Sequence, residues 1–215
     1  MQIDTETPAR WRRRKEARPQ EILDAALAVF ADKGFAAARM DDIAARAGVT
    51  KGTIYLYFDG KEAVFKTLVR ESIGDTLGRV VESANGFEGS AADLLRMILR
   101  MIGHFIRTSD RVVLPKIVIA EFGNFPELAR FYREEVVEKG LAALGSVIAR
   151  GVARGEFRKV APEHAARLCI APILLAAVWR TTFAKIDAQP YDLEGLIETH
   201  IDVLLRGLAA EGEIP

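Results

Sequence analysis

Hydroxyl, ammonium and aromatic side chains are concentrated in the run Thr50-Lys-Gly-Thr-Ile-Tyr-Leu-Tyr-Phe58 and at Lys61 just beyond it. Such groups can hydrogen-bond to base edges and phosphates, and a threonine methyl can contact a thymine methyl. Ile54 and Phe58 are spaced so that a helix would turn both inward and expose the polar side chains. The chemistry that this run favours is contact with the major groove of DNA, and the alternative is a plain surface turn.

On a helix in the major groove, the amino-terminal residues lie nearest the base edges. We therefore expect Lys51 to donate to guanine acceptors and Thr53 to contact a thymine methyl, whereas Tyr57 and Lys61 would meet phosphates. Gly52 costs a helix interior about 1 kcal/mol relative to alanine. That cost is expected where a side chain would prevent the backbone from approaching the duplex.

The preceding residues can position this helix. Asp41 and Asp42 place negative charge at the start of a short helix that begins near Met40, and Gly48 supplies the left-handed backbone that ends it. The Thr50 hydroxyl can then accept a hydrogen bond from a free N–H in the first turn of the next helix. Two short helices joined by a tight turn are therefore predicted, which is a helix-turn-helix signature.

These residues carry a resemblance to a known family. Over about residues 20–68 the chain resembles the DNA-binding domain of the tetracycline-repressor (TetR) family. The matching runs are Gly34-Phe35, Asp42-Ile43-Ala44, Ala47-Gly48-Val49, Lys51-Gly52-Thr53-Ile54-Tyr55, Tyr57-Phe58 and Lys61-Glu62-Ala63-Val64-Phe65. The resemblance implies an all-α homodimeric transcription regulator, usually a repressor. Its amino-terminal three-helix domains would bind a palindromic operator, and its larger carboxy-terminal domain would bind an effector.

The resemblance also implies roles for single positions. The base-facing positions are Lys51, Gly52, Thr53 and Tyr55, and the phosphate-facing positions are Tyr57 and Lys61. Family members commonly have Ser or Thr before the second helix, but this chain has Ala38-Arg39-Met40, so we expect Arg39 to contact phosphate instead. Leu56 stands where a polar or aromatic residue is frequent. The predicted DNA-binding set is Arg39, Thr50, Lys51, Gly52, Thr53, Tyr55, Tyr57 and Lys61.

Length and charge agree with a small DNA-binding domain beside a larger one. The chain has 215 residues, 50% of them hydrophobic, which is enough to bury a sizeable core. The net charge of +0 hides an excess of about +3 on residues 1–70. We predict a basic arm at residues 1–18, a helix-turn-helix domain at 19–65, and an effector-binding and dimerisation domain at 66–215. The basic cluster between Arg10 and Arg18 is either a DNA-contacting arm or a disordered tail.

Apolar residues at helical spacing predict helices through the rest of the chain. The first runs from near Pro19 to Lys33 and ends at Gly34. Another starts after the Asp59-Gly60 turn and continues to Asn85-Gly86. Because it enters the second domain, a shift of its far end could change DNA binding. The remaining helices are expected at about Ser90–Arg107, Val112–Phe122, Pro126–Arg154, Pro162–Lys185 and Leu193–Leu208.

The last two helices carry more apolar residues than one inward face requires, and we expect them to form a four-helix dimer interface. Pro172 is expected to kink the first of them. An effector cavity is expected among the middle helices, for an apolar, aromatic or lipid-like molecule. Its predicted lining is Met97, Met101, His104, Phe105, Phe122, Phe131, Trp179 and Phe183. The alternative for each is ordinary core packing.

Other classes of function find little support in the sequence. His104, His164 and His200 lie in no metal-ligand spacing, and no nucleophile elbow or phosphate loop appears, so we predict no enzyme, metal site or cofactor. The alternatives are a DNA-binding architectural protein without an effector, an activator, and a ligand-independent repressor. The single cysteine, Cys169, has apolar neighbours that favour a buried thiol over a redox sensor. Without an apolar signal core or a membrane-spanning run, we expect a cytoplasmic protein with no membrane partner.

Overall fold

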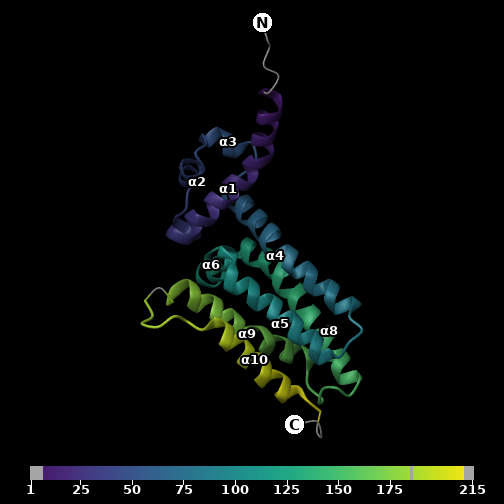
Figure 1. Cartoon of the computed structure of the whole chain (residues 1–215). Coiled ribbons are helices and arrows are strands. Elements are labelled where there is room, and N and C mark those ends of the chain that lie inside the picture. The colour runs from purple at the N-terminus through teal and green to yellow at the C-terminus, as the bar shows by residue number, and fades with distance from the viewer. Residues whose placement is uncertain (1–6, 185, 211–215) are drawn as a thin grey trace. The chain divides into compact units, whose positions relative to one another are not determined.

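The computed structural model describes residues 7–184 and 186–210, and the side chains of all of these except residues 7–17, 75 and 85. The described chain is helical, as expected, and its one isolated β-bridge joins Phe157 to Ala209. It separates into two compact units, Met1–Val69 and Arg70–Pro215. The first unit holds α1 (Thr7–Ala37), α2 (Met40–Ala47), α3 (Lys51–Tyr55) and the start of α4 (Lys61–Gly86). Figure 1 labels these four helices.

Helix α1 begins at Thr7 and passes through Pro19, where the sequence had suggested a start. Arginine, lysine and alanine are good helix formers, which explains why the basic stretch extends the helix. Residues 1–6 of the predicted arm lie outside the described residues. The regular path of α1 ends at Gly34, whose φ of 78° is readily adopted only by glycine. This is the predicted end of the helix.

The core of the first unit is built around three aromatic rings. Phe30, Phe35 and Phe65 are almost completely buried, with ring centroids 5.3 to 6.2 Å apart. Ile43 from α2 and Ile54 from α3 have no exposed surface. Each short helix is therefore fixed to the unit by an inward apolar side chain, which leaves its other side free for contact.

The second unit packs long helices around one apolar core. They are α5 (Ala91–Thr108), α6 (Val113–Glu121), α7 (Pro126–Tyr132), α8 (Lys139–Ala153), α9 (Pro162–Thr182) and α10 (Leu193–Leu208). Figure 1 shows α5, α8, α9 and α10 running past one another in this unit. Their shared core includes Leu95, Ile98, Val147, Ile173 and Ile201. The Ser90 hydroxyl caps α5 by accepting from the Asp93 N–H at 3.0 Å.

Several predicted boundaries were wrong. The single helix expected at Pro126–Arg154 contains a π-helical segment, η3 (Arg133–Glu138), between α7 and α8. Short 3₁₀ turns, η1 (Asp110–Val112) and η2 (Phe122–Asn124), flank α6. Helix α3 ends at Tyr55 although Phe58 was expected, and α9 ends at Thr182 before the predicted Lys185, which lies outside the described residues. Helix α9 continues through Pro172, and the kink expected there stays a prediction.

Helix α9 is the one helix of the described chain that is long and apolar enough to cross a membrane, judged by length and composition alone. Only 33% of its most apolar window is buried in a single chain, at a mean hydropathy of 1.3. Ala166, Cys169 and Ile173 turn into the core, whereas Leu168 and Leu175 are 64% and 63% exposed. An apolar stripe is therefore left uncovered on this helix.

Candidate nucleic-acid interface

The turn between α2 and α3 is specified by residues at both of its ends. Gly48 has φ 64° and ψ 33°, the left-handed conformation that lets α2 end without a Cβ clash. The Thr50 hydroxyl accepts a hydrogen bond from the Thr53 N–H at 3.2 Å, and the two hydroxyl oxygens lie 2.9 Å apart. The predicted cap is therefore present, and it fixes the direction in which α3 leaves the turn.

The outer side of α3 is open. Lys51 and Gly52 are exposed, and Tyr55 and Leu56 are 47% and 81% exposed. A Cβ built on Gly52 would meet only the Thr50 hydroxyl oxygen, at 3.9 Å. Packing within the domain therefore does not require a glycine at position 52. This agrees with the prediction that Gly52 lets the DNA backbone or bases come close to α3.

Lys51 is paired within the domain. Its ammonium donates to the Asp41 carboxylate of α2 at 3.0 Å, and this hydrogen bond raises the pKa of Lys51. Both side chains are more than half exposed, so the pair adds little stability. Lys51 can exchange this carboxylate for a DNA acceptor at small cost.

Asp42 stabilises the start of α2, where the hydroxyl cap is missing, by bonding the backbone of the cap residue Arg39. The backbone N–H of Arg39 donates to the Asp42 carboxylate at 3.1 Å, and Lys33 donates to the same group at 2.6 Å. The hydrogen bond from Lys33 is the main cause that lowers the pKa of Asp42. The signal in the sequence was an acid three residues after the cap position. The Arg39 side chain itself is exposed, as a phosphate contact requires.

Lys61 lies at the start of α4 and faces the end of α1. Its ammonium donates to the carbonyl oxygens of Phe35 and Ala36 at 2.9 Å and of Ala38 at 3.2 Å. It also sits 4.8 Å from the centre of the Phe35 ring. Lys61 therefore joins the α1–α2 connection to α4, a structural role that sequence reasoning missed. The predicted phosphate contact of Lys61, like that of the half-buried Tyr57, stays a prediction.

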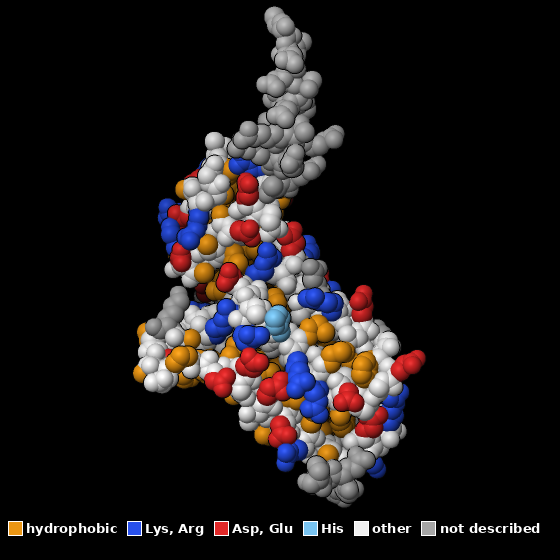
Figure 2. Space-filling model, in the orientation of Figure 1, with side chains coloured by type: hydrophobic (Ala, Val, Ile, Leu, Met, Phe, Trp, Pro, Cys, Tyr) orange, Lys and Arg blue, Asp and Glu red, His pale blue; other side chains and the backbone are white. Residues whose placement is uncertain are grey.

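Figure 2 shows acidic and basic side chains interspersed over the visible face of the first unit. Within this unit, two ion pairs join α1 to α2. They join Arg46 to Asp32 and Lys33 to Asp42, each at 2.6 Å. These two ion pairs neutralise four charges that could otherwise act on a polyanion. The basic cluster between Arg10 and Arg18 is the part of the sequence with an excess of positive charge.

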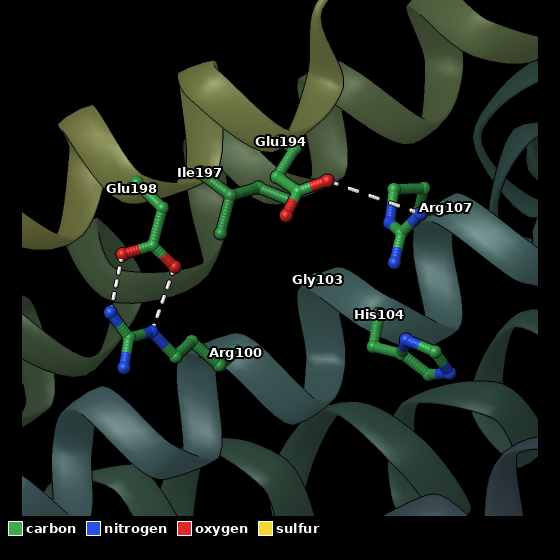
Figure 3. A pocket seen from close by; sticks show the side chains of 7 residues that line it. All are labelled: Arg100, Gly103, His104, Arg107, Glu194, Ile197 and Glu198. Atoms are coloured by element: carbon green, nitrogen blue, oxygen red, sulfur yellow. Dashed lines mark hydrogen bonds and ion pairs between the residues drawn. The ribbon is translucent and has the colours of Figure 1, made fainter.

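The second unit has an open groove of about 520 Å³ between α5 and α10. It is lined by Arg100, Gly103, His104, Arg107, Glu194, Ile197 and Glu198, as Figure 3 shows. Arg100 forms a two-pronged ion pair with Glu198 at 2.6 and 2.7 Å, and this pairing lowers the pKa of Glu198. Arg107 and Glu194 lie 4.0 Å apart toward the other end. The groove is therefore charged, unlike the apolar cavity predicted.

Of the residues predicted to line an effector cavity, His104 lines this groove and the others lie elsewhere. Met101 and Phe105 pack against the core from α5, and Met97 is 37% exposed. Phe122 is buried near Phe125, with ring centroids 6.4 Å apart.

The remaining predicted aromatic residues fall into two separate places. Phe131 lies under the Arg70 guanidinium at 5.0 Å. Trp179 and Phe183 are brought together, with ring centroids 4.9 Å apart, and the Trp179 N–H donates to Asp187 at 2.8 Å. The predicted set is thus divided among several sites, and its binding role stays a prediction.

Within the described residues, no group of three or more His, Cys, Asp or Glu side chains is arranged to hold a metal ion. His200 instead contacts the Cys169 carbonyl oxygen at 2.9 Å, which links α10 to α9. Cys169 is fully buried, and burial raises the pKa of its thiol to about 12. The predicted buried thiol is confirmed.

The chain matches two family models and is similar to curated transcriptional regulators. Residues 22–68 match bacterial regulatory proteins of the tetR family, and residues 88–190 match the tetracyclin repressor-like C-terminal domain. The fatty acid metabolism regulator protein of Bacillus subtilis is 29% identical over 196 residues, covering 90% of this chain and 98% of that protein. The HTH-type transcriptional regulator EthR of Mycolicibacterium smegmatis is 31% identical over 196 residues, covering 86% of this chain and 84% of that protein.

Solved structures show the same fold. The fatty acid degradation regulator FadR from Bacillus halodurans has a TM-score of 0.70 and 26% identity, covering 87% of this chain and 94% of that one. FadR from Bacillus subtilis in complex with stearoyl-CoA has a TM-score of 0.72 and 24% identity, covering 88% of this chain and 98% of that one. With a helix-turn-helix unit, a helical second unit and these relatives, the chain belongs to the TetR family of DNA-binding transcriptional regulators.

Proposed function

We propose that this protein is a transcriptional repressor that binds a palindromic operator as a homodimer and is released from it by a fatty-acyl effector. The observation that carries the proposal is the capped, exposed helix α3. Thr50 fixes its start, Ile54 anchors its inner side, and Lys51, Gly52 and Tyr55 are left open for the major groove. Thr53 adds its methyl, and Arg39, Tyr57 and Lys61 are the proposed phosphate contacts.

The homodimer is supported by the apolar surface that α9 and α10 leave uncovered. Leu168 and Leu175 of α9 and Val203 of α10 are each more than 60% exposed. Leu196 and Val203 are spaced so that they share one side of α10. Monomers rarely leave so much apolar surface in water, and a two-fold dimer matches a palindromic site.

The effector class is supported by the names of the relatives. Two of them, from Bacillus subtilis and Bacillus halodurans, are regulators of fatty acid metabolism or degradation. The sequence independently predicts an apolar or lipid-like molecule from its aromatic and methionine residues. We propose that the effector is a long-chain acyl thioester. We also propose that the protein acts in the cytoplasm, where it binds the chromosome.

Selection of bound fragments from the source genome by the purified protein tests the DNA function. Enrichment of a pseudo-palindrome is the expected result, and affinity for it should fall steeply with salt concentration because phosphates are neutralised. Diffuse enrichment without a shared sequence would instead indicate an architectural DNA-binding protein. Placing the selected site inside or upstream of a promoter in a reporter then separates a repressor from an activator.

Release from the selected site tests the effector. Stearoyl-CoA should dissociate the complex, whereas free CoA should not, because each buried methylene adds about 0.8 kcal/mol to binding. Release by both compounds would show that the acyl chain is not what is recognised. Release by neither would leave a ligand-independent regulator as the better interpretation.

A further inference from the structure

Most polar side chains of the DNA-reading surface already have partners within the first unit. Lys51 donates to Asp41, and the Thr53 hydroxyl lies 2.9 Å from that of Thr50. Lys61 donates to three backbone carbonyl oxygens. A DNA contact by any of these groups replaces an existing interaction, so it adds less to affinity than a wholly new contact would, even where the exchange costs little, as for Lys51.

Leu56 is the most exposed apolar side chain on this surface. It is 81% exposed and forms the carboxy-terminal cap of α3, where its φ of −73° and ψ of −19° continue the helical path. Gly52 lies four residues earlier and therefore one turn away on the same side. Helical side chains lean toward the preceding turn, which directs Leu56 toward the bare backbone of Gly52.

Gly52 leaves open space on this side of α3. It has no side chain, and the one atom near a Cβ built on it is the Thr50 hydroxyl oxygen, 3.9 Å away. Tyr55, 47% exposed, adds an aromatic side chain next to Leu56 in sequence.

We infer that Leu56 is a specificity-determining residue that reads the C5-methyl group of a thymine in each half-site. Thymine is the one base that presents a methyl group in the major groove, and apolar side chains recognise it there. This inference rests on the proposed operator binding and names a residue where the chain departs from the usual family pattern. It assigns Leu56 a contact with a base, where a phosphate contact would require a polar side chain.

The test compares thymine with deoxyuridine, which lacks only the methyl group. Wild-type protein and Leu56→Ala are first used to select duplexes from a random library. We expect a required thymine in each half-site for the wild type and a relaxed preference there for Leu56→Ala. In the selected site, replacing that thymine by deoxyuridine should weaken wild-type binding about fourfold for each half-site, the effect of one buried methyl.

The same replacement should leave binding of Leu56→Ala unchanged, because the variant no longer contacts the methyl. Ile119→Ala is the matched control, since Ile119 is 60% exposed on α6 and lies outside the first unit. It should respond to deoxyuridine as the wild type does. Equal sensitivity in the wild type and Leu56→Ala would overturn the inference while leaving operator binding intact. Failure of the wild type to select any shared sequence would instead overturn the proposed function.

Discussion

Lys61 has two possible roles that a single substitution separates. In the structure its ammonium binds three carbonyl oxygens at the end of α1. Hydrogen bonds from a charged donor stabilise by about 1.5 to 3 kcal/mol, so Lys61→Met should lower the free energy of unfolding by roughly 2 kcal/mol. Urea unfolding of the DNA-free protein measures this loss, and Lys159→Met, at an exposed position, is the control for removing a charge.

A phosphate contact by Lys61 has a different signature. Removing one phosphate-binding lysine reduces the dependence of log affinity on log salt by about 1. Unchanged stability together with such a reduction would mean that the ammonium leaves the carbonyl oxygens when DNA binds. A loss of stability with an unchanged salt slope would confine Lys61 to positioning α4.

Cys169 should be unreactive in the folded protein. Burial raises the pKa of its thiol from 9.0 to about 12, so the thiolate that reacts is scarce at any pH well below 12. We expect a disulfide reagent at pH 8 to label the native protein very slowly and the urea-unfolded protein quickly. Cys169→Ser provides the unlabelled reference, and rapid labelling of the native protein would contradict the burial.

Residue contacts that were predicted correctly are those with near neighbours in the chain. The Thr50 cap bonds only three residues ahead, so the sequence displays both partners together. Arg100 and Glu198 are 98 residues apart, and nothing local marks them as a pair. The sequence identified Lys61 as a candidate contact residue. Its bonds to backbone carbonyl oxygens could not be predicted, because every residue has such an oxygen.

At the scale of the helix-turn-helix element, replacing either of two glycines by alanine should change stability, in opposite directions. Gly48 is in the left-handed region, so Gly48→Ala should cost about 1 kcal/mol in the free energy of unfolding. The new Cβ would crowd the adjacent backbone, although no other part of the domain lies within 4 Å of it. Gly52 lies within α3, so Gly52→Ala should raise helix stability by up to about 1 kcal/mol. Thermal unfolding of both variants measures the two changes.

For Gly52→Ala, DNA affinity should fall although stability rises. Gly52→Ala places a methyl where we propose that the duplex approaches, so it should bind the selected operator more weakly while being the more stable protein. Wild-type affinity in Gly52→Ala would show that the backbone of α3 stays clear of the bases. Such a result would also argue against a base approaching α3 beside Leu56.

Element boundaries could be predicted where caps and glycines mark them. Ser90 caps the start of α5, Pro162 starts α9, and Gly34 ends the regular part of α1, each close to the predicted boundary. The early start of α1 and the π-helical segment η3 could not be predicted. Basic residues suit both a helix and a tail, and a π turn depends on packing against other helices rather than on local residue types.

At the scale of the whole molecule, the proposed dimer depends on the exposed stripe of α9 and α10. Leu168→Glu and Leu175→Glu should each give a monomer in sedimentation velocity, because a charge would be buried without a partner in the interface. Both variants should also lose affinity for the full operator, since one half-site then binds alone. Ile119→Glu should remain dimeric. Dimers in all three variants would place the interface elsewhere.

The π-helical segment η3 also acts as a phase shift along one helix. It adds about one residue to the helical path, which corresponds to roughly 100° of rotation. Leu128 and Tyr132 are buried before it, yet only residues after it, such as Leu144 and Val147, belong to the main core of the second unit. The apolar residues before and after η3 can therefore face two different directions along the segment from Pro126 to Ala153.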